Sequence, residues 1–196
     1  IRQSNREILE QRELLIEIRG LVTNKVSLTE SIINFLGGLS ARYRVKSGNE
    51  LLDQINELLL KVDVVPESLV LAQAANESGW GTSRFAQQAN NLFGIWCFTP
   101  GCGLTPLSRD DGLNHEVARY ESIEDSIDAY MYTINTNPAY AHLRQIRAKT
   151  RDNKGVMSGL TLAEGLLNYS ARGADYVKEI QQLIRANNLQ AFNLPV

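Results

Sequence analysis

The sequence lacks several features that mark common classes of protein. Its 196 residues carry a formal net charge of −2, which excludes the strongly basic footprint of a nucleic-acid-binding domain. No apolar run is long enough to cross a bilayer, so we expect no transmembrane segment. The chain starts inside an amphipathic helical pattern, and a leader is expected to be absent from it. What remains is the composition of an ordinary globular protein.

Motifs for cofactor and nucleophile chemistry are also missing. The sequence has no glycine-rich phosphate loop, no nucleophile elbow and no Cys-His pair at a familiar spacing. We therefore expect no cofactor and no metal. The densest basic run alternates with apolar helix positions, which predicts a solvated helix face; an anion-binding patch is the alternative. This run comprises Arg144, Arg147, Lys149 and Arg151.

Only two cysteines are present, Cys97 and Cys102, and they flank a Pro100-Gly101 pair. Pro-Gly suits the centre of a type II turn, which brings the two sulfurs close to bonding distance. A small disulfide loop is therefore predicted, and it indicates an oxidising compartment, periplasmic or extracellular. Zinc held with His115 and His142 is an alternative, although the spacing matches no familiar zinc pattern. Two free buried thiols are the other alternative.

Hydrophobic periodicity predicts a mostly helical α+β fold. Residues 1–61 read as charged and amphipathic helices, expected to form an N-terminal extension packed on a domain at 62–196. Between about residues 89 and 111 the composition changes and becomes rich in Asn, Gly, Pro and aromatic residues, which indicates loops. Residues 104–107 and 114–120 are predicted to pair as a β-hairpin. Helical periodicity then returns to the end of the chain.

Glu77 is the most informative residue. It ends a helix that is predicted to begin at Pro66, and residues 69–75 offer only apolar groups and one amide. Such a segment should form a buried central helix, with Gly79 as its left-handed stop. The helix dipole and apolar surroundings, with Trp80 closing over them, would oppose ionisation there. We therefore expect Glu77 to retain a proton and to act as a general acid.

An ordinary helix-end glutamate paired with Arg84 is the alternative for Glu77. Two motifs around Glu77 point elsewhere. Residues 72–83 read Ala-Gln-Ala-Ala-Asn-Glu-Ser-Gly-Trp-Gly-Thr-Ser, and residues 90–95 read Asn-Asn-Leu-Phe-Gly-Ile. In this order they resemble the bacterial glucosaminidase family, which includes autolysin catalytic domains. The longer match through the cysteine loop resembles its Bax-like branch. The resemblance spans about residues 62–185 and implies a lysozyme-like helical domain with a small β-hairpin lobe.

The resemblance implies hydrolysis of a β-1,4 bond after N-acetylglucosamine in peptidoglycan or a related glycan. Glu77 aligns with the essential acid of the family. The second carboxylate often lies on the hairpin, which makes Glu116 the candidate base or charge stabiliser. Asp110, Asp111 and Glu121 compete with it. The acetamido group of the substrate is a further alternative, as nucleophile. Alternation along the strand places the side chain of Glu116 on the opposite face from those of its two immediate neighbours. It does not identify which of the two faces meets the cleft.

Several aromatic and amide side chains are candidates for binding the glycan, because sugars present apolar faces and polar edges. For Phe93 and Trp96 the alternative is packing beneath the loop, and for Asn91 it is a bond to turn backbone. The family resemblance places Tyr140 near the acid. The predicted substrate-binding set is Trp80, Asn91, Phe93, Trp96, Tyr140 and Tyr169.

Two other functions fit the same motifs. A lytic transglycosylase shares the fold and the single acid but cuts the neighbouring bond. A non-catalytic glycan-binding module would use the same cleft, although it gains nothing from a costly protonated acid in the groove.

Overall fold

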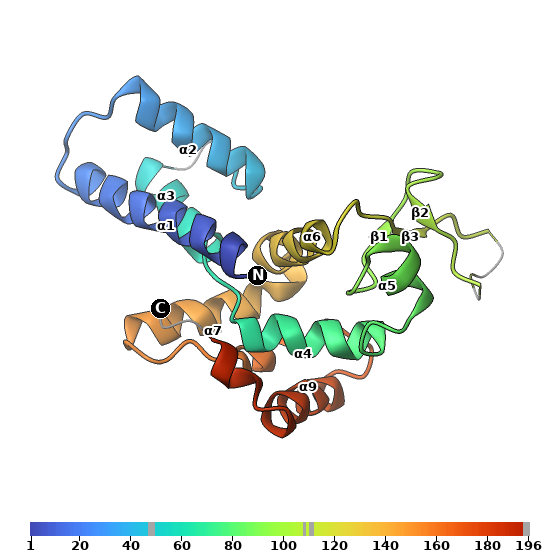
Figure 1. Ribbon diagram of the computed structural model, residues 1–196. Helices are drawn as coiled ribbons and strands as arrows, with labels where there is room; N and C mark the ends of the chain where they lie inside the picture. The colour runs from blue at the N-terminus through green and yellow to red at the C-terminus, as the bar shows by residue number, and fades with distance from the viewer. Residues whose placement is uncertain (47–49, 108, 110–111, 194–196) are drawn as a thin grey trace.

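The computed structural model describes residues 1–46, 50–107, 109 and 112–193, and it is mostly helical with one small β-sheet (Figure 1). This confirms the predicted fold class. The elements, with η for 3₁₀ helices, are α1 (Arg2–Thr23), α2 (Glu30–Arg42), α3 (Leu51–Lys61), α4 (Glu67–Ser78), α5 (Arg84–Ala89), β1 (Trp96–Cys97), β2 (Gly103–Leu104), β3 (Glu116–Ala118), α6 (Ile123–Thr136), η1 (Pro138–Tyr140), α7 (Ala141–Asp152), α8 (Gly159–Leu162), η2 (Ala163–Leu166), α9 (Ala174–Ala186) and η3 (Leu189–Phe192).

Helix α4 runs through the middle of the molecule, and its C-terminal end points toward the sheet (Figure 1). It packs against α8, α9 and η3, and Leu69, Val70 and Gln73 are fully buried. The prediction of a buried central helix is therefore confirmed. Gly79 takes the left-handed conformation, with φ 58° and ψ 50°, and ends the helix as expected.

Helix α6 is fixed at both ends by local sequence. Ser122 and Asp125 form a capping box, in which each side chain accepts a hydrogen bond from the other residue's backbone amide. At the far end Asn137 leaves the helix, and Pro138 starts the short helix η1. This break turns the chain so that Tyr140 follows within one helical turn, on the side of the cleft described below.

The sheet is three-stranded and antiparallel, in the order β1-β3-β2. The predicted hairpin is confirmed only in part: Leu104 pairs with Val117 as expected, but the strand starts at Gly103, residues 105–107 do not pair, and β1 was not located from the sequence. In the observed register Trp96 pairs with Val117. A Cβ at Gly103 would lie 1.9 Å from the Val117 carbonyl oxygen, so only glycine allows β2 to approach this closely.

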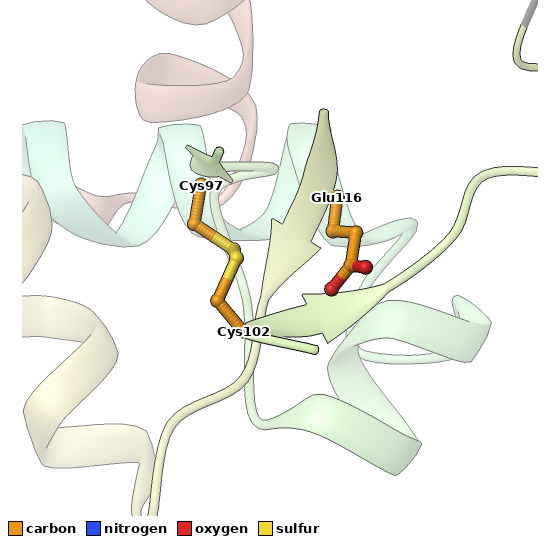
Figure 2. Close-up of side chains that lie close together, drawn as sticks. All are labelled: Cys97, Cys102 and Glu116. Atoms are coloured by element: carbon orange, nitrogen blue, oxygen red, sulfur yellow. A yellow bond between two sulfur atoms is a disulfide. The ribbon is translucent and has the colours of Figure 1, made fainter. Parts of the chain in front are cut away.

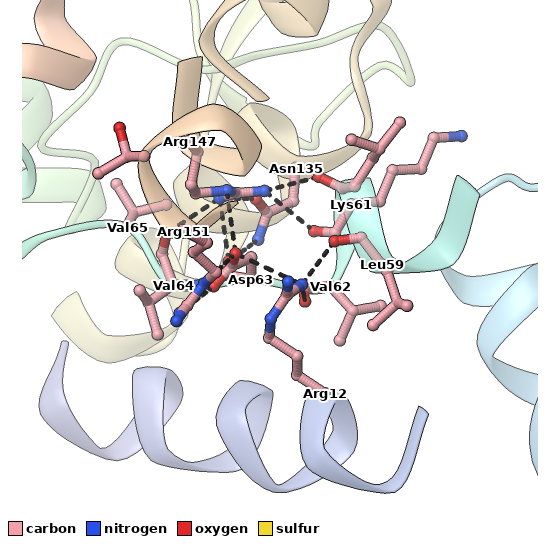
Figure 3. Close-up of polar contacts among 12 residues, drawn as sticks. Arg12, Leu59, Lys61, Val62, Asp63, Val64, Val65, Asn135, Arg147 and Arg151 are labelled. Atoms are coloured by element: carbon pink, nitrogen blue, oxygen red, sulfur yellow. Dashed lines mark hydrogen bonds and ion pairs between the residues drawn. The ribbon is translucent and has the colours of Figure 1, made fainter. Parts of the chain in front are cut away.

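A buried ionic cluster joins the N-terminal helices to the rest of the chain (Figure 3). Asp63, in the link between α3 and α4, forms ion pairs with Arg12 of α1 and with Arg147 and Arg151 of α7. Arg147 also donates to the backbone carbonyl oxygens of Asp63 and Val64. The hydrophobic core likewise extends from α1 into α4. The division at residues 61 and 62 stays a prediction.

This cluster corrects the prediction for the basic run. Arg147 has 0% exposure and Arg144 is also buried, so these two members of the run are not on a solvated helix face; Lys149 is exposed and Arg151 is half-buried. Arg144 donates to the carbonyl oxygens of Ile134 and Asn137 instead. Guanidinium groups were mistaken for surface residues because their partners are backbone carbonyls and an aspartate far away in sequence. Within the described residues, none of the helices combines the length and apolar character that a bilayer crossing requires.

Candidate active site

Two hollows meet at the C-terminal end of α4, and Glu77, Gly94 and Trp96 line both of them. The first, of about 560 Å³, is rich in tyrosine, and we call it the tyrosine hollow. The second, of about 450 Å³, lies against the sheet, and we call it the sheet hollow. The tyrosine hollow is completed by Phe93, Ile95, Tyr130, Thr133, Asn137, Tyr140 and Tyr169. The sheet hollow is completed by Phe85, Pro106, Arg109, Leu113, His115 and Val117.

Glu77 is exposed, so the expectation that apolar groups enclose it is wrong. In the last turn of α4 Ser78 stays buried, whereas the Glu77 side chain is exposed and lines both hollows. Trp80 does not close over it: this side chain is 63% exposed and lines neither hollow. Arg84 is not the partner of Glu77 either, since the Arg84 guanidinium donates to the Thr105 carbonyl oxygen at 2.7 Å. An open position leaves Glu77 accessible to a bound molecule.

A chain of hydrogen bonds leads from the core to Glu77. Tyr130 donates its hydroxyl to Oε1 of Gln73, and Nε2 of Gln73 donates to the Tyr176 hydroxyl at 2.9 Å. Tyr176 in turn donates to Oε1 of Glu77 at 2.6 Å. Burial, the negative charge of Glu77 and this hydrogen bond all raise the pKa of Tyr176 above its ordinary value. Tyr176 therefore remains a donor and fixes one carboxylate oxygen.

The tyrosine hollow brings together four predicted binding residues, Phe93, Trp96, Tyr140 and Tyr169. Phe93 is buried and stacks on Tyr130, with ring centroids 4.1 Å apart. Tyr140 packs against Tyr169 at 5.8 Å, and Tyr169 stacks on Tyr176 at 5.3 Å. Burial and then the charge of Glu77 raise the pKa of Tyr140. The wall thus offers ring faces and neutral hydroxyls beside the carboxylate.

Asn91 does not face either hollow, which corrects its assignment as a binding residue. Its side chain is 1% exposed and bonds only to backbone: the amide donates to the carbonyl oxygens of Ile95 and Ala118, and its oxygen accepts from the amides of Phe93 and Ile95. Every polar atom is therefore used in holding the loop from residue 90 to 95. Asn91 shapes the site by fixing the backbone that presents Phe93 and Trp96.

Trp96 is 56% exposed and lies on the border between the hollows. One face of its ring stacks on His115, with centroids 4.0 Å apart. His115 directly precedes β3, and Trp96 itself pairs with Val117 of that strand, so the sheet holds the indole in place. A rigid, exposed indole beside a carboxylate is suited to stacking against the apolar face of a sugar ring.

Glu116 points away from both hollows, which corrects its assignment as the second catalytic carboxylate. His115 and Val117 line the sheet hollow, so alternation along β3 puts Glu116 on the other face. There its carboxylate accepts hydrogen bonds from the amides of Gly101 at 3.1 Å and Gly103 at 2.7 Å. These two bonds lower the pKa of Glu116 below its ordinary value.

Glu116 lies instead beside the Cys97–Cys102 disulfide (Figure 2). The predicted disulfide is confirmed, as is the turn, in which the Cys102 amide donates to the Thr99 carbonyl oxygen. Ligand atoms of these three side chains lie within 4.8 Å of one another. While the sulfurs are bonded to each other they are not thiolates, and so do not offer a zinc site. The disulfide and Glu116 together fix the loop between β1 and β2.

Among the described residues that line the hollows, Glu77 is the only acid. Glu121 is exposed and lines neither, whereas Asp110 and Asp111 fall outside the described residues. The sequence interpretation missed Gln73 and Arg109, and it considered Tyr176 only as a weak candidate without foreseeing its bond to Glu77. For Gln73 a signal existed, because an amide one turn before Glu77 in an otherwise apolar helix lies on the same face.

Comparisons with known proteins agree with these motifs. The family model described as "Mannosyl-glycoprotein endo-beta-N-acetylglucosaminidase" matches residues 52–189. "Protein bax" of Escherichia coli (strain K12) is 37% identical over 142 residues, which are 72% of this chain and 50% of that protein. The chain thus spans about half the length of this relative. The catalytic domain of the autolysin Auto from Listeria monocytogenes aligns with a TM-score of 0.49 and 21% identity, over 90% of this chain and 96% of that one.

Proposed function

Because this chain belongs to the glucosaminidase family, we propose that it is a glycoside hydrolase that cleaves β-1,4 bonds after N-acetylglucosamine in peptidoglycan or a related glycan. Glu77 is the general acid in this proposal. The observation that carries it is the position of this carboxyl where two hollows meet. When a glycan occupies both hollows, the bond between two of its sugars lies at Glu77.

The chemistry follows from that position. Glu77 gives its proton to the glycosidic oxygen as the bond from this oxygen to the anomeric carbon breaks. The leaving sugar departs as an alcohol, and positive charge develops on the sugar that remains. When a glycan binds, it excludes water from the Glu77 carboxyl. The bound sugars then provide the apolar surroundings that Glu77 lacks in the free protein. Trp96 and the rings of Tyr140 and Tyr169 hold the sugars on either side.

A second carboxylate is not required. Since Glu77 is the only acid among the described residues lining the hollows, we propose that the acetamido oxygen of the substrate attacks the anomeric carbon. Water then opens the resulting ring and leaves a hydrated N-acetylglucosamine end. Glu77, as a carboxylate after the first step, accepts the proton from that water.

The test is Glu77→Gln assayed on purified peptidoglycan. A glutamine is nearly isosteric but has no proton to give, so release of reducing ends should fall by about 100- to 10,000-fold. Glu121→Gln is a matched control, because this exposed acid lines neither hollow. Full activity of a folded Glu77→Gln protein would refute the mechanism.

The absence of a second acid among the described lining residues also favours a lytic transglycosylase, in which a hydroxyl of the substrate replaces water. Mass spectrometry of the products distinguishes the two, since anhydro-muramic ends indicate the transglycosylase. Binding of muropeptides without any cleavage on long digestion would indicate a glycan-binding module instead.

We also propose that the protein acts in the cell envelope, in the periplasm or outside the cell. The Cys97–Cys102 disulfide requires oxidising conditions, and peptidoglycan lies in the same compartments.

A further inference from the structure

Gln73 is a fully buried amide that lines neither hollow, although it lies one turn before Glu77 on the same face of α4. Its side chain joins two helices that come from distant parts of the chain. Oε1 accepts a hydrogen bond from the Tyr130 hydroxyl of α6, and Nε2 donates to the Tyr176 hydroxyl of α9 at 2.9 Å. Both tyrosines are buried. Gln73 therefore acts on the site only through its neighbours.

The Tyr130 hydroxyl fixes which way this amide points. Burial raises the pKa of Tyr130, so the hydroxyl keeps its proton and needs an acceptor for it. Among the described residues, Oε1 of Gln73 is the acceptor found for that proton. If the amide were turned over, Nε2 would face Tyr130 and the hydroxyl proton would be left in the core without a partner. Oε1 therefore faces Tyr130, and Nε2 faces Tyr176.

The direction of the amide decides how Tyr176 uses its single proton. Since the Tyr176 hydroxyl accepts from Gln73, its own proton goes to Oε1 of Glu77 at 2.6 Å. In the opposite direction Tyr176 would donate to Gln73 and would accept the proton of a neutral Glu77, which would then point into the core. In the observed direction Oε1 of Glu77 is already an acceptor. The proton that Glu77 gives away is then on Oε2, for which no hydrogen-bond partner is found among the described residues.

We propose that Gln73 is a positioning residue for proton transfer: it fixes the direction of the hydrogen-bond chain and so keeps the acid proton of Glu77 on Oε2, available to the glycosidic oxygen. This inference rests on the proposed function and adds a residue that acts on the acid without touching the glycan. The chain then runs in one direction, from the core at Tyr130 outward to the cleft.

Gln73→Glu tests the direction while keeping the shape of the side chain. When ionised, the introduced carboxylate accepts from both tyrosine hydroxyls, so Tyr176 takes up the proton of Glu77 instead of donating to it. When protonated, the introduced carboxyl donates to Tyr176 as the amide does. Its pKa should be raised by burial and by the charge of Glu77, the charged group nearest to it beside the hydroxyls of Tyr130 and Tyr176.

The kinetic signature of Gln73→Glu follows from these two states. We expect kcat on peptidoglycan to be close to that of the wild type in acid and to fall below it, by about a hundredfold at about pH 8, as the introduced carboxyl ionises. KM should stay within about twofold, because Gln73 lines neither hollow. A role in packing alone would give a loss that does not change with pH.

Gln73→Met removes both polar atoms and leaves Tyr176 free to point either way, so kcat on peptidoglycan should fall about tenfold. A dinitrophenyl glycoside of a chitooligosaccharide has a leaving group that needs no proton, and both variants should cleave it at the wild-type rate. Gln54→Met is the matched control. This half-buried amide of α3 donates to the Ser40 hydroxyl, lines neither hollow, and should leave both rates unchanged.

Neutron diffraction of the wild-type protein locates the same protons without turnover. A deuterium bonded to the Tyr176 oxygen and directed at Glu77 is expected, and one directed at Gln73 would overturn the inference. Equal kcat of Gln73→Glu and the wild type at every pH would also overturn it, as would an equal loss on the dinitrophenyl glycoside. These results leave hydrolysis at Glu77 standing. A wild-type protein that cleaves neither substrate would refute the proposed function instead, and diffraction would still decide the direction of the chain.

Discussion

Gln73 and Glu77 lie one turn apart on α4, and this spacing is readable in the sequence. The identity of the group that connects them is not. Tyr176 is 99 residues from Glu77, and only the packing of α9 against α4 brings its hydroxyl between the two side chains. The sequence thus pointed to Glu77 as the proposed acid, but predicted neither the exposure of its side chain nor its hydrogen-bond donor. Both depend on contacts between distant segments.

Removing that donor should impair catalysis without unfolding the protein. In Tyr176→Phe the ring stacking on Tyr169 is kept, but Oε1 of Glu77 loses its hydroxyl partner and the carboxyl turns more freely. We expect kcat to fall about tenfold, equivalent to one hydrogen bond of about 1.4 kcal/mol. Steady-state kinetics and a thermal melt measure this, with Tyr120→Phe, which lines neither hollow, as control.

The pH dependence of the wild-type protein provides a second readout for Tyr176. Its pKa is raised, so the hydroxyl keeps its proton above the pH at which an ordinary tyrosine ionises. Activity should therefore show no loss from tyrosinate formation up to about pH 10. Wild-type kinetics in Tyr176→Phe at every pH would show that the hydroxyl has no role in positioning Glu77.

At the level of elements, alternation along the strand correctly placed Glu116 and His115 on opposite faces. It did not show which of the two residues faces the cleft. The second neighbour of β3 is β1, which was not located because two residues are too few for a periodic signal. The hairpin alone, without β1 and the packing around it, leaves the two faces of β3 equivalent. The catalytic assignment of Glu116 failed for this reason.

Glu116→Gln should therefore behave unlike Glu77→Gln. Its activity on peptidoglycan should stay within about twofold of wild type, because the side chain lies on the far face of the sheet. Its stability should depend less on pH. Since the pKa of Glu116 is lowered in the folded protein, the carboxylate stabilises the fold above its unfolded pKa, and this is lost as the pH falls through the lowered value. Loss of activity in a stable Glu116→Gln protein would contradict this placement.

Across the whole molecule, the largest error of the sequence interpretation was the basic run. Charge alone suggested a surface position for Arg147, although it lies one turn after the buried Leu143, and nothing local indicates that residues of α3 and α6 converge on it. In the structure it is surrounded by Asp63, Asn135 and backbone carbonyls, with Arg12 reaching in from α1 (Figure 3). Three arginines around one aspartate make the cluster a joint between the N-terminal helices and the rest of the chain.

Replacing Asp63 tests that joint. Burial alone would raise the pKa of Asp63, but the charges of Arg147 and Arg12 and the hydrogen bond from Arg151 outweigh it, so the pKa lies below its ordinary value. Asp63→Asn leaves three cations without their buried anion, and the free energy of unfolding near pH 7 should fall by about 3–5 kcal/mol. Urea denaturation measures this, and Asp175→Asn, which removes an exposed pair with Lys178, should cost less than about 1 kcal/mol.

The sign of the pH dependence separates this ionic role from simple packing. A carboxyl with a lowered folded pKa contributes its full stability above the unfolded value of about 4, and that contribution disappears as the pH falls through the folded value. The wild-type protein should therefore lose its advantage over Asp63→Asn in acid, and the two unfolding free energies should converge. A constant difference between them from pH 7 down to about pH 2 would mean that Asp63 acts through shape and not through charge. Convergence would instead identify the cluster as the acid-sensitive contact by which α1 is held to the domain that carries the cleft.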